Sequence, residues 1–136
     1  MAHTAITNAQ VAVDAPLDTA LITALRDNAD ANGVYGLTWT DKTGSRSLDT
    51  VYQNTSGHPL WVSVSGDFGQ GGDGAALQAF VGSSSPPTVE VVKQQGYNST
   101  ANAEVNVFFV VPDDHYYEVN DDDNGTVTVQ EWAELE

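Results

Sequence analysis

The sequence predicts a mainly β protein: an antiparallel, jelly-roll-like β-sandwich preceded by one short N-terminal amphipathic helix. From Trp39 onward, short runs of β-branched and aromatic residues alternate with clusters of turn-forming residues. These runs recur at roughly 8–12 residue spacing, which is typical of sandwiches and barrels. A helical period is found only before residue 30. We therefore divide the 136 residues into an N-terminal arm with a docking helix, 1–36, and a sandwich domain, 37–136.

The helix is predicted over about residues 15–28. Asp14 can cap its start, Pro16 suits its first turn, and Asp18 complements the positive end of the helix dipole. Apolar residues then recur at helical spacing, and a helix of about three turns cannot bury such a stripe alone. The helix is expected either to lie on the sandwich or to pack against copies of itself. Four residues of the stripe are assigned to docking: Leu17, Leu21, Ala24 and Leu25.

Seven β-strands are predicted between turn clusters, at 50–52, 60–65, 76–81, 88–92, 104–110, 116–119 and 126–129. The second strand alternates cleanly, with apolar side chains at Leu60, Val62 and Val64. Asn124-Gly125 is a favoured hairpin dipeptide, so the last two strands are expected to pair as a hairpin.

Trp61 falls out of phase with the apolar positions of its strand and is expected to face outward. Burial against a neighbouring subunit is the preferred interpretation, and a carbohydrate-stacking face is the alternative. A glycine-rich loop at 69–74 follows this strand. Trp61, Gln70 and Asp73 are the candidate residues for facing a receptor.

The charge balance excludes several classes of partner. There are 19 Asp and Glu residues against 4 Lys and Arg residues, for a net charge of −15. Such a surface repels phosphate, so nucleic acids and anionic membrane surfaces are not expected to bind. No apolar run is long enough to cross a bilayer, and no signal peptide is expected. With no cysteine, disulfides, zinc-thiolate sites and thiol catalysis are excluded.

The acidity also predicts a protein adapted to high salt. The chain is rich enough in aromatic residues to fold, and 13 of its 19 acids are Asp, whose short side chain holds hydration close to the surface. At molar ionic strength the Debye length is about 3 Å, so the carboxylates barely repel one another. We expect thermal unfolding, followed by circular dichroism, to move to much lower temperature when ~2 M salt is replaced by ~20 mM salt. Equal stability in both buffers would contradict the prediction.

An acidic segment near the C-terminus resembles a calcium loop in its spacing. Asn120, Asp122, Asn124 and Glu131 take loop positions 1, 3, 5 and 12, with Gly125 at the turn. Hard cations such as Ca²⁺ and Mg²⁺ favour oxygen ligands around a glycine turn. The flanks have the pattern of strands, however, and position 1 is Asn instead of Asp. A solvated hairpin tip explains the segment equally well, so both interpretations stand, and no other cofactor is expected.

No catalytic constellation is found in the sequence. The histidines, His3, His58 and His115, lie in an arm, a turn and an acidic stretch, and no nucleophile elbow accompanies them. The chain is therefore expected not to be an enzyme.

Two stretches of the chain resemble virion proteins of tailed phages. Residues 13–28 are similar to a short N-terminal segment of such proteins. Downstream, the pattern is that of β-domains at the ends of tail fibres and spikes: Arg46, then Thr50, Tyr52, Asn54, Thr55, Gly57 and Pro59, then Val111-Pro112, Tyr116 and Trp132-Ala133-Glu134-Leu135. No coiled-coil or collagen-like trunk is present, so a compact component is expected.

The resemblance implies a structural component of a virion, located in a tail tip, a fibre end or a capsid vertex. Together with the acidity it implies a virus of a halophilic archaeon, assembled in the host cytoplasm at high salt. The expected partners are the chain itself, as a homotrimer or homopentamer, other virion proteins and host-envelope glycans. The alternative is a stand-alone surface module that binds carbohydrate or is stabilised by calcium.

Overall fold

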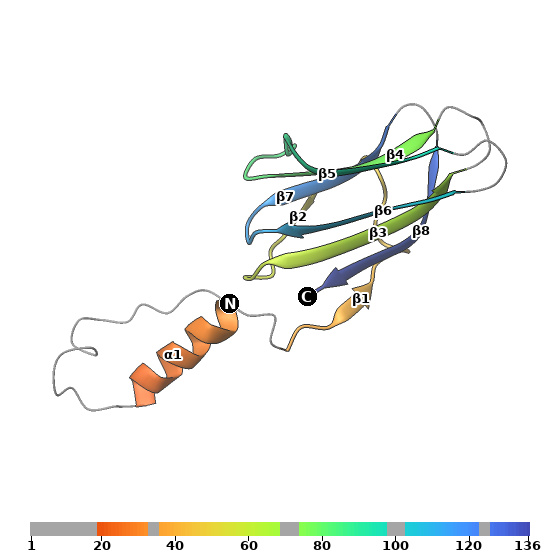
Figure 1. Cartoon of the computed structure of the whole chain (residues 1–136). Coiled ribbons are helices and arrows are strands. Elements are labelled where there is room, and N and C mark those ends of the chain that lie inside the picture. The colour runs from red at the N-terminus through yellow and green to blue at the C-terminus, as the bar shows by residue number, and fades with distance from the viewer. Residues whose placement is uncertain (1–18, 33–35, 69–73, 98–102, 123–125) are drawn as a thin grey trace.

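The computed structural model describes residues 19–32, 36–68, 74–97, 103–122 and 126–136. One helix precedes eight strands along the chain (Figure 1). These elements are α1 (Thr19–Asn32), β1 (Trp39–Asp41), β2 (Tyr52–Gln53), β3 (Leu60–Phe68), β4 (Ala75–Gly82), β5 (Val89–Gly96), β6 (Ala103–Val111), β7 (Tyr116–Asp121) and β8 (Val127–Leu135).

The strands form two antiparallel sheets of four. Sheet A has the order β1-β8-β3-β6 and sheet B the order β2-β7-β4-β5. The pairing is nested, because β1 pairs with β8, β2 with β7, β3 with β6 and β4 with β5. The predicted antiparallel sandwich behind one short helix is therefore confirmed. The jelly-roll-like winding stays a prediction.

The hydrophobic core lies between the facing sheets. In β3 every second residue from Leu60 to Phe68 is buried, and β6 alternates in the same way. The largest fully buried side chain is Trp132 of β8, followed by Tyr117 of β7. Full burial of each Val, Leu or Phe contributes about 1.5–3 kcal/mol, so this alternation is what holds the sheets together.

The expected hairpin between the last two strands is wrong. β7 pairs with β2 and β4 in sheet B, whereas β8 pairs with β1 and β3 in sheet A. The chain therefore crosses from one sheet to the other between β7 and β8. Asn124 and Gly125, which suggested the hairpin, lie outside the described residues. A turn-forming dipeptide favours a change of direction, but it does not decide which strands pair.

Two strand segments were not predicted, β1 and residues 130–135 of β8. β1 has only three residues, too few to show a period. β8 runs on to Leu135, but a register shift opposite Ser65 and Gly66 interrupts its alternation. Gly66 is required there, since a Cβ would lie 2.5 Å from Val127 Cγ1 and 2.9 Å from the carbonyl oxygen of Thr128.

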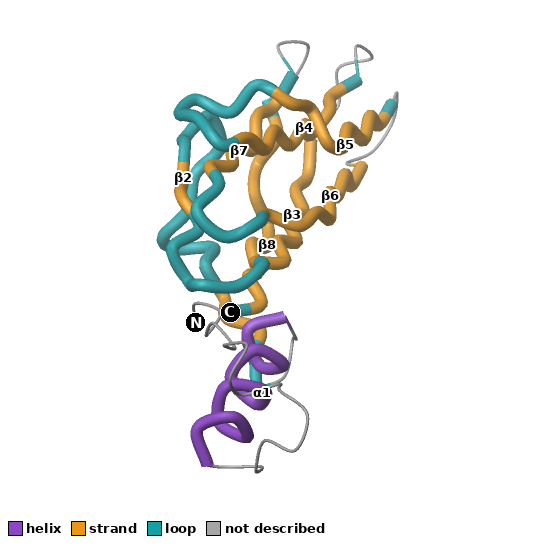
Figure 2. Tube along the Cα trace, turned by 90° about the vertical axis from the view of Figure 1, so that its left-hand side faces the viewer, coloured by secondary structure: helices purple, strands orange, loops and turns teal. Residues whose placement is uncertain are grey.

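Helix α1 stands clear of both sheets, beyond the end of sheet A where β1 begins (Figures 1 and 2). Within the described residues it starts at Thr19 and continues to Asn32, four residues past the expected end. The Asn and Asp residues at 28–32 disfavour a helix only weakly, and the first glycine is Gly33. None of the described helices is long and apolar enough to span a bilayer.

Candidate functional site

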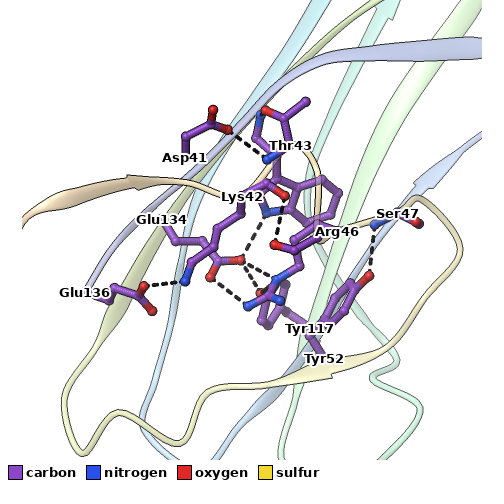
Figure 3. A network of polar contacts seen from close by, with 11 residues as sticks. Asp41, Lys42, Thr43, Arg46, Ser47, Tyr52, Tyr117, Glu134 and Glu136 are labelled. Carbon is purple, nitrogen blue, oxygen red and sulfur yellow. Dashed lines mark hydrogen bonds and ion pairs between the residues drawn. The ribbon is translucent and has the colours of Figure 1, made fainter.

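A polar cluster is buried between the two sheets, at the edge where β1 and β2 lie (Figure 3). At its centre is Glu134 of β8, which is fully buried. Arg46, from the loop between β1 and β2, binds it with two hydrogen bonds: Nε donates to Oε1 at 2.8 Å and Nη2 donates to Oε2 at 2.9 Å. This two-pronged geometry is the strongest form of carboxylate–guanidinium pairing.

Aromatic side chains from both sheets complete the cluster. The Tyr117 hydroxyl donates to Glu134 Oε1 at 2.5 Å, and Trp132 Nε1 donates to the same oxygen at 3.1 Å. The Arg46 guanidinium carbon lies 4.5 Å from the centre of the Tyr52 ring, a cation–π contact. Tyr52 in turn accepts a hydrogen bond from the backbone N–H of Ser47 at 2.9 Å.

The cluster ties the loop between β1 and β2 to both sheets. Both carboxylate oxygens of Glu134 accept hydrogen bonds, and the residue is closed off from solvent. Burial by itself lowers the pKa of Arg46, but its hydrogen bond to Glu134 and the neighbouring Tyr117 outweigh this and raise that pKa. The arginine therefore fastens its loop to β8 of sheet A and β7 of sheet B. A second ion pair, between Lys42 and Glu136, ties the same loop to the C-terminus.

The cluster predicts a stability that falls at alkaline pH. Burial, with the hydrogen bond to Glu134, raises the pKa of Tyr117 well above the ordinary value of 10.0. The folded protein thus keeps the phenol proton where the unfolded chain releases it. This contribution is complete below about pH 10 and falls by about 1.4 kcal/mol per pH unit above it. Urea unfolding from about pH 8 to about pH 11 measures the slope, which we expect to be shallower in Tyr117→Phe. Equal slopes would contradict this.

Exposed apolar side chains gather on the outer face of sheet A, where β3 begins and β6 ends. This end of the sheet is the one nearest α1 (Figure 1). One backbone row crosses all four strands there, with Trp39 opposite Leu135, Leu135 opposite Trp61, and Trp61 opposite Val110. Phe108 stands two residues from Val110 on the same face. We call these five residues the aromatic band.

The rings of the aromatic band touch one another and remain open to solvent. The Phe108 centroid lies 5.6 Å from that of Trp61 and 6.4 Å from that of Trp39, with tilted planes. Trp39 is 50% exposed, Phe108 51% and Val110 38%. Exposed apolar residues gathered in this way mark a binding surface more often than scattered ones do.

The opposite end of the same face is acidic. Asp67, Glu104 and Glu131 line a shallow depression together with Ser65, Gly66 and Gln130. This end of the outer face of sheet A therefore carries three carboxylates, whereas the aromatic end has Asp41 at its margin. Since like charges repel, a second copy of this acidic chain would approach more readily at the aromatic end.

The structure describes three of the four predicted metal ligands. Asn120 lies in β7 of sheet B and Glu131 in β8 of sheet A, while Asn124 is outside the described residues. Asp122 forms an ion pair with Lys93 at 3.0 Å. Among the described residues, no group of three or more His, Cys, Asp or Glu side chains could hold a metal ion. Binding of Ca²⁺ or Mg²⁺ stays a prediction.

The predicted receptor-facing and docking residues do not lie together in the described structure. Trp61 points outward and is half-buried by its neighbours in the aromatic band. On α1, Leu21 and Ala24 are buried, whereas Leu25 is 48% exposed. Leu17, Gln70 and Asp73 lie outside the described residues.

The sequence pattern did not predict the other four members of the aromatic band as surface residues: Trp39, Phe108, Val110 and Leu135. A signal was present for two of them, because the run Val105–Val111 is apolar at six of its seven positions, with Asn106 as the exception. A strand with apolar residues on both faces needs a partner on each face.

Comparison of the sequence with protein-family models gives no match, and comparison with curated proteins gives none either.

Proposed function

We propose that the protein is a non-enzymatic structural component of a virion, a homo-oligomer at a tail tip, fibre end or capsid vertex. The observation that carries the proposal is the aromatic band, an uncharged surface with two half-exposed rings on a protein with net charge −15. Such a surface is costly to leave in water, and burial in a subunit interface removes the cost.

The resemblance to tail-fibre and spike domains supports the virion part of the proposal. Its pattern contains Arg46, Tyr52, Trp132 and Glu134, which meet in the buried cluster although they are up to 88 residues apart. A fifth pattern residue, Asn54, fixes a turn through its buried side chain. These five residues of the pattern therefore share a physical task, which is to hold the sandwich and one of its turns in shape.

A second candidate function, carbohydrate binding, is favoured by the same exposed rings. Sugars stack on Trp and Phe faces, and weak contacts add up when copies are linked. Oligosaccharides of glucose and of N-acetylglucosamine serve as probes. A change in tryptophan fluorescence on titration into a monomeric sample would favour this candidate over assembly.

The native mass tests the proposed function. Light scattering behind a size-exclusion column in ~2 M salt, where charge repulsion is screened, should give an oligomer. A trimer supports a tail-tip or fibre-end component, and a pentamer supports a capsid-vertex component. A monodisperse monomer at micromolar concentration would contradict the proposal.

A further inference from the structure

We infer that the aromatic band binds helix α1 of a neighbouring copy of the same chain. The inference rests on the proposed function and identifies the contact that builds the oligomer. The occupant is a second copy because the chain itself carries an exposed helix face that matches the band in both apolarity and charge.

The matching face of α1 contains Ile22, Leu25 and Arg26. These residues are spaced i, i+3 and i+4, so their side chains project from one side of the helix. Ile22 is 52% exposed, Leu25 48% and the Arg26 side chain 68%. Arg26 pairs with Asp27, its immediate neighbour, in an exposed ion pair of little energetic worth. The face thus offers two apolar side chains beside a positive charge that is available to a partner.

The surroundings of the aromatic band complement that face. None of its five members is charged, and exposed Asp41 lies at its margin, in the backbone row that runs through Ala133 and Ser63 to Phe108. The backbone N–H of Thr43 donates to Asp41 at 2.9 Å and lowers the pKa of that carboxyl. Ile22 and Leu25 would cover the rings while Arg26 faces Asp41.

The placement of α1 favours exchange between copies. The helix stands clear of its own sandwich, at the end of sheet A that carries the band (Figures 1 and 2). From Asn32 to Trp39 there are seven residue steps, which reach at most about 25 Å. The helix and the band are different surfaces of one chain, so their contact is heterologous. Heterologous contacts form a ring when the rotation between neighbouring copies closes, and a trimer or pentamer is such a ring.

Disulfide trapping tests the inference, because the chain has no cysteine of its own. Leu25→Cys and Val110→Cys are made as separate proteins, one with a mass tag, and are mixed and oxidised in ~2 M salt. We expect a cross-linked heterodimer. The matched control is Val89→Cys, an exposed valine of β5 in sheet B, which should cross-link to Leu25→Cys at least tenfold less. The control position is more exposed than the test position, 58% for Val89 against 38% for Val110, so accessibility alone would favour the control. Circular dichroism checks that each variant is folded.

The native mass of the same mixtures separates the two proposals. An oligomer in which Leu25→Cys links equally to Val110→Cys and Val89→Cys would overturn the inference and leave the proposed function standing. The mass of a single chain in every mixture would overturn both. An oligomer with preferential linkage to Val110→Cys would support both.

Discussion

Replacing Arg46 by Met should lower the free energy of unfolding by at least about 3 kcal/mol, the largest effect we expect from one substitution. Methionine keeps much of the aliphatic volume but leaves the buried Glu134 carboxylate without its cation. Such an uncompensated charge costs several kcal/mol, and a domain of this size should lose roughly 10 °C in Tm. Urea and thermal unfolding in high salt measure the change.

Two further variants test whether the unpaired charge of Glu134 causes the loss of stability. Lys93→Met removes the cation of an exposed ion pair with Asp122 and should cost less than about 1 kcal/mol. Adding Glu134→Gln to Arg46→Met removes the stranded charge, so the double variant should be more stable than Arg46→Met alone. If the second substitution instead lowers stability further, the buried charge is not what Arg46 compensates.

Replacing Asn54 by Ala should cost on the order of 3 kcal/mol, the second largest effect. Its amide nitrogen donates to the carbonyl oxygens of His58 at 2.8 Å and Val111 at 3.0 Å. Its side-chain oxygen accepts from the Ser56 hydroxyl at 2.7 Å. Asn54 is 2% exposed, so water cannot replace these partners and buried polar groups would be left unpaired.

Thr55→Ala, at the exposed neighbouring position, is the matched control and should change stability by less than about 0.5 kcal/mol. Both variants are compared by urea unfolding in the same high-salt buffer. A similar small loss for Asn54→Ala would mean that the turn at 54–59 holds its shape without the amide.

Local pattern was sufficient to predict most of the sandwich. The alternation of Leu60, Val62 and Val64 predicts a strand with one buried face, and these three side chains are buried in β3. The apolar stripe through Leu21 and Ala24 likewise predicts the helix, and both residues lie in α1. In both cases the signal lies within a few residues of sequence, where periodicity is informative.

Pairing across the chain could not be predicted in the same way. Arg46 meets Glu134 only because nested pairing returns β8 to β1, a separation of 88 residues. In the sequence, Glu134 is simply an acid between two apolar residues, with nothing to mark it as buried. The aromatic band depends on the same long-range register, since its five members come from four strands.

The accessibility of the tryptophans tests most directly the central claim, that this sandwich assembles by burying its aromatic band. Trp132 is buried in every state, whereas Trp39 and Trp61 belong to the band. Acrylamide quenching of tryptophan fluorescence is measured across protein concentration in ~2 M salt, together with the native mass. We expect quenching to fall as the mass rises from one chain to the oligomer. Quenching that stays unchanged while the oligomer forms would contradict the claim.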